Sequence, residues 1–141
     1  MKVGFIGLGN AGGKLAGSLL RNDVELTVRD LDKTTAKNLL KEGAKWADSP
    51  KQMAENVDMV ITCLPSPSAC ANVMEGEDGI LNGLSKGKIW AEMSTTDSNE
   101  VKRLSEKVLA LEAHPIDCPV SGGCHRAATG NISILAGCDR N

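Results

Sequence analysis

Three glycines near the start of the chain have a spacing that could hold a phosphate group. Gly7, Gly9 and Gly12 read G-x-G-x-x-G and lie between an apolar run at residues 3–6 and a helical apolar pattern. In a strand–turn–helix unit the first glycine permits the sharp turn, the second lets a pyrophosphate approach bare backbone, and the third lets the helix lie close to the strand. The free N–H groups and the dipole at the start of the helix then attract the phosphates. The motif predicts a dinucleotide site at Gly7, Leu8, Gly9, Asn10, Ala11 and Gly12.

An acidic residue that would complete this site follows close to the expected interval. Asp30 ends the second predicted strand, 23 positions after Gly7 (30 − 7 = 23). A carboxylate at this place accepts hydrogen bonds from the adenosine ribose hydroxyls and repels a 2′-phosphate. We therefore expect Asp30 and its neighbour Leu31 to contact the cofactor, and NAD to be favoured over NADP. Asp32 is the alternative ribose ligand, although it also suits the N-cap of the next helix. Arg29 could soften the preference for NAD.

The elements that must position these residues alternate along the chain. Strand patterns fall at residues 3–6, 24–28, 44–47, 57–64, 88–93, 115–120 and 132–136. Helical patterns run from the glycine turn to about residue 21, over 32–41 and about 50–56, after Ser66, and after a capping group at 94–97. The last of these helices carries an apolar stripe at Val101, Leu104, Val108 and Leu111. The unbroken apolar run 57–64 is typical of a central parallel strand covered on both faces. The alternation predicts one α/β domain over residues 1–141, a Rossmann-type doubly wound, mostly parallel sheet with helices on both faces.

The loops that follow the strands are the remaining candidates for a site. In open α/β sheets, ligands bind beyond the carboxyl ends of the strands. Five loops should meet there, at residues 7–12, 30–32, 64–66, 94–96 and 121–123. Leu64 and Pro65 would present backbone and an apolar wall to the nicotinamide side, and we expect Thr95 to contact the cofactor. The hydroxyls of Ser94 and Thr96 suit either cofactor contact or capping of the following helix.

Composition argues against several other functions. The formal net charge is −2 with acids and bases interspersed, and the chain has only one Phe and two Trp, which argues against a nucleic-acid surface. We see no signal peptide and no apolar run of membrane-spanning length. The five cysteines are scattered without a C-x-x-C pair, which favours reduced thiols over a disulfide or metal framework. We expect a cytoplasmic protein that binds small molecules and no metal.

Five segments, taken together, carry a family resemblance. They are residues 4–9, 60–65, 79–81, 92–95 and 117–123, the last reading Asp-Cys-Pro-Val-Ser-Gly-Gly. In this order they resemble the β-hydroxyacid dehydrogenases, which include 3-hydroxyisobutyrate dehydrogenase and tartronate semialdehyde reductase and are related to 6-phosphogluconate dehydrogenase. The resemblance covers essentially the whole chain. It implies an NAD-dependent oxidoreductase that transfers a hydride between a nicotinamide cofactor and a small β-hydroxy acid or its semialdehyde. It also implies that Ser121, Gly122 and Gly123 bind the substrate carboxylate, for which N–H groups at a glycine turn are suited.

Departures from the family pattern bear on cofactor choice. Many relatives carry Asn-Arg-Thr where this chain has Asp30, Leu31 and Asp32, and that arginine suits NADP. Its replacement by leucine supports NAD. Glu92 stands where aspartate is common, and Cys118 where alanine is common.

The resemblance also implies a catalytic lysine and an all-helical second domain beyond residue 137. The sequence has no lysine after Lys107. We therefore expect residues 1–141 to be a cofactor domain, truncated before the helical domain, with no catalytic residue of its own and inactive alone; a homo-oligomer would need the missing domain. Two alternatives stay open. One is a non-catalytic nucleotide-binding or docking module of the same fold, and the other is an NADPH-dependent semialdehyde or imine reductase.

Overall fold

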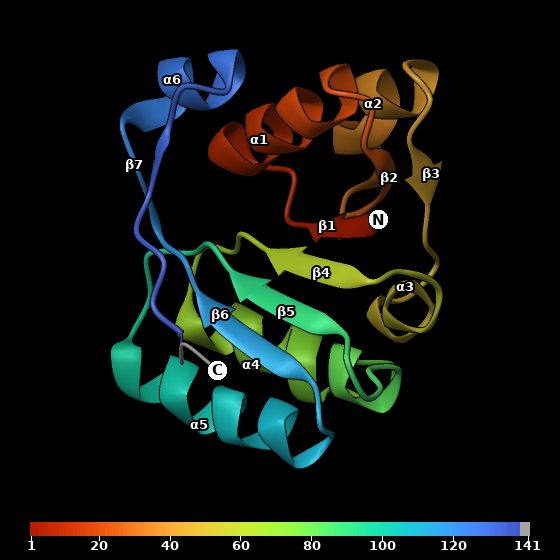
Figure 1. Cartoon of the computed structure of the whole chain (residues 1–141). Coiled ribbons are helices and arrows are strands. Elements are labelled where there is room, and N and C mark those ends of the chain that lie inside the picture. Colours follow the sequence, from red (N-terminus) through yellow and green to blue (C-terminus); the bar gives the residue numbers. More distant parts are fainter. Residues whose placement is uncertain (139–141) are drawn as a thin grey trace.

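Six parallel strands form the central sheet of the molecule (Figure 1). The computed structural model describes residues 1–138. The strands are β1 (Lys2–Ile6), β2 (Glu25–Arg29), β3 (Lys45–Trp46), β4 (Met59–Thr62), β5 (Ile89–Glu92) and β6 (His114–Asp117), in the order β3-β2-β1-β4-β5-β6. The order changes direction between β1 and β4, and this is the switch point at which doubly wound sheets bind ligands. The predicted Rossmann fold is confirmed.

Helices cover both faces of the sheet. On one face lie α1 (Asn10–Arg21), the 3₁₀ turn η1 (Lys33–Ala36) and α2 (Lys37–Lys41). On the other lie α3 (Pro50–Asn56), α4 (Pro67–Glu75), the 3₁₀ turn η2 (Ile80–Asn82) and α5 (Ser98–Ala110) (Figure 1). In the part of the chain described, no helix is long and apolar enough to cross a membrane.

Each face of the sheet has its own hydrophobic core, because successive strand residues point to opposite sides. Phe5 and Ile61 belong to the core beneath α1, whereas Ile6 and Val60 belong to the core beneath α3, α4 and α5. Val60, Ile61 and Thr62 are all buried. The apolar run at 57–64 is thus a central strand covered on both faces, as predicted, although β4 itself is shorter.

Local capping signals in the sequence explain where several helices begin. Ser49 and Ser66 each accept a hydrogen bond from a backbone N–H three residues later, and each is followed by proline at the first helical position. Asp32 caps η1, so the predicted helix at 32–41 begins as a 3₁₀ turn. At α5 the cap is Asp97.

One member of the predicted stripe in α5 does not belong to it. Val101, Leu104 and Val108 are buried, whereas Leu111 lies after the end of the helix and is 36 % exposed.

The end of the chain differs from the prediction. β6 ends at Asp117, and Val120 instead begins β7 (Val120–Ser121), which pairs antiparallel with β8 (Ser133–Ile134) outside the main sheet. The predicted strands at 115–120 and 132–136 were therefore wrong in their bounds. The second was also wrong in its location, because β8 does not belong to the parallel sheet. Pro119 offers no N–H for continuing the ladder, and Gly122 turns the chain at φ 128° into α6 (Gly123–Thr129). Helix α6 lies beside α1 (Figure 1).

An ion-pair cluster joins α4 to α5 at the surface. The Glu75 carboxylate accepts from Arg103, with Nη2 to Oε2 at 2.6 Å, and from Lys107; Arg103 also pairs with Glu100. These partners, Arg103 first, lower the pKa of Glu75 from 4.5 to about 2. A lowered carboxyl pKa means that the pair stabilises the fold fully above the ordinary pKa and that this contribution is lost as the pH falls towards 2.

We predict that Glu75→Gln lowers the stability at pH 7 by at most about 1 kcal/mol, because partly exposed pairs are screened by solvent. The difference from wild type should shrink between about pH 5 and pH 2, where the wild-type carboxylate becomes protonated. Thermal unfolding at several pH values measures both effects. Glu112→Gln, which breaks only the exposed pair with Lys86, is the control and should show a smaller difference. A pH-independent difference for Glu75→Gln would contradict the assignment.

Candidate functional site

A pocket of 720 Å³ lies at the carboxyl ends of β1, β2 and β4. It brings together nine of the eleven residues predicted to contact a cofactor: Gly7, Gly9, Asn10, Ala11, Gly12, Asp30, Leu31, Leu64 and Pro65. Its volume is in the range of pockets that bind small molecules and cofactors. Three of the five predicted loops therefore meet at one edge of the sheet.

The glycine turn shows why glycine is needed at two of its three positions. Gly7 has a φ of 99°, and a Cβ there would lie 2.1 Å from the carbonyl oxygen of Cys63. A Cβ on Gly12 would lie 1.9 Å from the carbonyl oxygen of Gly7. These are the sharp turn and the close helix–strand contact that the sequence predicted.

Gly9 has a different environment. A Cβ built on it would meet no atom within 4 Å, so its bare backbone faces open space at the pocket. Gly9 is also the N-cap of α1 and offers no side chain to the first N–H groups of the helix. Those N–H groups have no partner within the helix. The start of α1 is thus an arrangement of donors that suits a phosphate.

Asp30 is fixed over this turn by two backbone hydrogen bonds. Its Oδ2 accepts from the N–H of Leu8 at 2.7 Å, and its Oδ1 accepts from the N–H of Asp32 at 3.0 Å. Leu8 is buried and does not line the pocket; instead its N–H holds the carboxylate in place. Each carboxylate oxygen can accept a second hydrogen bond. Asp30 therefore lines the pocket with acceptor capacity to spare, and it fastens the end of β2 to the turn after β1.

The neighbours of Asp30 have other partners. The carboxylate of Asp32 accepts from the N–H and hydroxyl of Thr34, and these bonds lower its pKa. Arg29 lines the pocket, but its Nη1 donates to the carbonyls of Ala47 at 3.0 Å and Asp48 at 2.6 Å. Asp32 thus acts as a cap, and Arg29 fastens the segment after β3.

Leu31 and Leu64 are apolar residues of the pocket lining with different surroundings. The side chain of Leu31 is fully exposed at the rim. The N–H of Leu64 donates to Ser94 Oγ at 2.7 Å. Ser94 is therefore neither a helix cap nor a pocket residue. Thr95 is exposed and does not line the pocket, and Thr96 Oγ1 is a buried atom without a hydrogen-bond partner in the described part of the chain.

Ser121, Gly122 and Gly123 do not line this pocket. They are exposed where β7 meets α6, beside α1 (Figure 1). Gly122 and Gly123 both have positive φ, at 128° and 74°. These three residues belong to the segment 118–136, which follows β6. Arg21 holds this segment against α1 by donating to the carbonyl of Ala128. The structure thus places the predicted substrate residues on the α1 side, outside the pocket walls.

Sequence reasoning missed one wall of the pocket. Pro50 and one side of α4 also line it, at Ala69, Asn72 and Val73, followed by Gly76, Asp78 and Gly79. The spacing 69, 72, 73 and 76 is that of a single helix face. This spacing, in a helix that starts directly after the loop at 64–66, was the signal that could have identified the wall.

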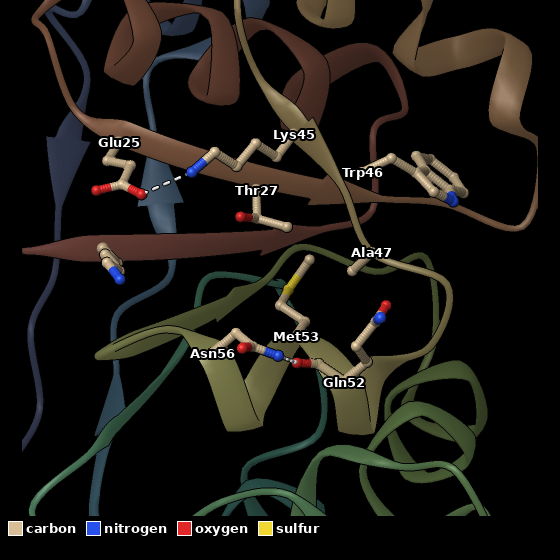
Figure 2. Close-up of a pocket in the computed structure, with 9 residues that line it drawn as sticks. Glu25, Thr27, Lys45, Trp46, Ala47, Gln52, Met53 and Asn56 are labelled. Atoms are coloured by element: carbon tan, nitrogen blue, oxygen red, sulfur yellow. Dashed lines mark hydrogen bonds and ion pairs between the residues drawn. The ribbon is translucent and has the colours of Figure 1, made fainter.

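A second pocket, of 320 Å³, lies beside the first residues of β1, β2 and β3. Figure 2 shows Lys45 reaching Glu25, with Nζ to Oε1 at 2.9 Å, and Asn56 bonded to the carbonyl of Gln52. None of the predicted cofactor residues lines this pocket. We assign no function to it.

Comparison with known proteins identifies the family. Residues 2–141 match the model of the NAD binding domain of 6-phosphogluconate dehydrogenase, and the chain belongs to this family. Mitochondrial 3-hydroxyisobutyrate dehydrogenase from Mus musculus is 37% identical over 135 residues, which are 96% of this chain and 40% of that protein. The resemblance inferred from the five segments is confirmed.

Solved structures give the same result. The structure of 3-hydroxyisobutyrate dehydrogenase from Salmonella typhimurium has a TM-score of 0.89 and 31% identity, covering 96% of this chain and 47% of that one. Psf3 in complex with NADP+ and 2-OPP has a TM-score of 0.93 and 28% identity, covering 98% and 49%. The chain spans about two fifths to one half of the length of these relatives.

We predict different effects of alanine at two glycines of the same motif. Gly12→Ala should lose about 1–3 kcal/mol of stability or more, because its Cβ would meet a backbone oxygen that cannot move aside. Gly9→Ala should cost about 1 kcal/mol or less, because its Cβ meets open space and the remaining loss is that alanine is a poorer N-cap than glycine. Urea unfolding of the two variants measures this. Equal losses would show that the turn does not have the described packing.

Proposed function

We propose that this chain is the cofactor domain of an NAD-dependent β-hydroxyacid dehydrogenase. The observation that carries the proposal is the 720 Å³ pocket at the switch point between β1 and β4. The glycine turn, the Asp30 carboxylate and the wall of Leu64 and Pro65 meet in that one pocket. The names of the relatives from mouse and Salmonella support the reaction class.

The residues of the pocket would each hold a different part of the dinucleotide. The N–H groups at Asn10 and Ala11 would bind the pyrophosphate, which would occupy the open space beside Gly9. Asp30 would accept from the adenosine ribose hydroxyls. Leu64 and Pro65 would border the nicotinamide, which supplies hydride transfer when bound. This apolar wall would keep water away from the transferred hydride.

We infer a preference for NAD from the charges near Asp30. Its carboxylate would repel a 2′-phosphate, and Leu31 beside it offers no cation. Arg29 is engaged with two carbonyls, and the ammonium of Lys33 lies 5.1 Å from the ring centre of Trp46. The Psf3 structure contains NADP+, so the fold itself does not exclude the phosphorylated cofactor.

We predict that NAD binds at least about 10-fold more tightly than NADP in isothermal titration of the wild-type chain. Leu31→Arg should narrow this ratio, because a guanidinium at the rim can pair with the 2′-phosphate. Leu31→Ala removes the same side chain without adding charge and should leave the ratio unchanged. Tighter binding of NADP by the wild type would overturn the assignment and favour the NADPH-dependent reductase.

The substrate and the proton-transfer step belong to a second part of the proposal. Ser121, Gly122 and Gly123 would hold the carboxylate of a small β-hydroxy acid or semialdehyde through a hydroxyl and backbone N–H groups. The relatives are longer than this chain, and the rest of such a protein would supply the helical domain, a lysine as general acid or base, and the contacts of a homo-oligomer. In this proposal residues 1–141 bind the cofactor without completing the active site.

We predict that the 141-residue chain alone does not turn over. Proton transfer by a positioned group contributes roughly 10²–10⁴-fold to such reactions, and no lysine follows Lys107. NADH fluorescence, followed with NAD and 3-hydroxyisobutyrate, should stay at the level of an enzyme-free control. Steady NADH production by the purified chain would contradict this division of roles.

We also infer a cytoplasmic location. All five cysteines are free thiols in the structure, which suits a reducing compartment. The mouse relative is named as a mitochondrial protein, so a tagged copy followed by microscopy would decide between the two compartments.

A further inference from the structure

One acidic side chain lies under the pocket without any cation beside it. Glu92, the last residue of β5, is fully buried. In the described residues, none of the ion pairs includes it. A buried carboxylate without a counter-ion is destabilising unless hydrogen bonds satisfy its oxygens. The hydrogen bonds to the Glu92 carboxylate therefore decide whether its burial is tolerated.

Three donors from three different segments satisfy the carboxylate. Oε1 accepts from the N–H of Ser94 at 2.7 Å, and Oε2 accepts from Thr62 Oγ1 at 3.0 Å and Cys70 Sγ at 2.7 Å. Trp90 Nε1 donates to Thr62 Oγ1 at 3.0 Å, so the hydroxyl proton of Thr62 is free to point at Glu92. Burial, and then the charge of Glu92, raise the pKa of the Cys70 thiol, which keeps it protonated as a donor.

This network continues to the pocket wall along one branch. The N–H of Ser94 is held by Glu92, and the hydroxyl of Ser94 accepts from the N–H of Leu64 at 2.7 Å. Leu64 lines the pocket, and the preceding carbonyl, that of Cys63, lies against Gly7. Through Cys70, Glu92 also contacts α4, the helix whose other residues form the wall that includes Ala69. The carboxylate thus joins β4, β5 and α4 beneath the nicotinamide side.

We propose that Glu92 is a positioning residue for the nicotinamide half of the cofactor, which acts by holding Ser94 in the orientation that fixes Leu64. The inference rests on the proposed cofactor function of this pocket. Glu92 does not touch the cofactor itself. Glu92 sets the position of the apolar wall at Leu64. The adenosine diphosphate half of the cofactor is held by the glycine turn and Asp30, which do not depend on Glu92.

The test compares two ligands in isothermal titration of the 141-residue chain. ADP would occupy the turn and Asp30 alone, whereas NAD would also contact Leu64 and Pro65. Ser94→Ala removes the acceptor for the N–H of Leu64 and should weaken NAD by about 3- to 10-fold, the range expected for one hydrogen bond, while ADP changes by less than about 2-fold. Glu92→Ala, which removes both acceptor oxygens and with them the partner of the Ser94 N–H, should have the same selective effect.

Thr62→Val is the matched control. It removes one buried hydroxyl from the same carboxylate but leaves the branch from Glu92 through Ser94 to Leu64 intact. It should lower the melting temperature, because the indole N–H of Trp90 loses its acceptor, and should leave the NAD-to-ADP affinity ratio at the wild-type value. If Glu92→Ala does not fold, the comparison of Ser94→Ala with Thr62→Val decides the question.

The outcomes separate this inference from the proposed function. Equal weakening of NAD and ADP in Ser94→Ala, or an equal change of ratio in Thr62→Val, would overturn the positioning role while NAD binding by the wild type stands. A wild-type chain that binds neither ligand would overturn the proposed function and the positioning role with it.

Discussion

The cofactor edge of this molecule depends on the close approach of three backbone segments at Gly7. The carbonyl of Cys63 after β4 and the helix at Gly12 both come so near to Gly7 that no Cβ fits at either glycine. No side chain fits on Gly7 or Gly12, so the closest contacts between β1, β4 and α1 at this junction are made by backbone atoms. This arrangement also fixes the point at which α1 begins. Gly9 and the first residues of α1, whose N–H groups have no partner in the helix, therefore lie at the pocket.

Hydrogen bonds to two carboxylates then hold the segments around this junction in place. Asp30 ties β2 to the turn through the N–H of Leu8, and Glu92 ties β5 to the loop after β4 through Ser94. The first carboxylate lines the pocket, and the second is fully buried and does not line it. Both accept from backbone N–H groups, and through these bonds each couples a strand end to a loop. Asp30 lines the pocket itself, whereas Glu92 is linked to it through Ser94 and Leu64.

Features with a local cause were predictable from the sequence, and features with a long-range cause were not. The glycine turn, the Ser49 and Ser66 caps and the apolar run of β4 each have a signal within a few residues. The sequence left two roles open for Ser94, that of a cofactor ligand and that of a helix cap. Its hydrogen-bond partner is the N–H of Leu64, which is 30 residues away and gives no local signal. The strands after β6 were misplaced because a two-residue strand such as β7 carries no periodicity, and only its pairing with β8 defines it.

The chain makes a closed excursion after β6. It leaves the sheet at Asp117, passes through β7, α6 and β8, and returns to Gly137, where two backbone hydrogen bonds of 3.0 and 2.6 Å join Gly137 to Asp117. Because Asp117 and Gly137 bond to each other, residues 118–136 form a loop that is closed at its base. A change in the length of this closed loop would leave the pairing of β6 with β5 in place, whereas its position beside α1 depends on α6 and its buried Ala127.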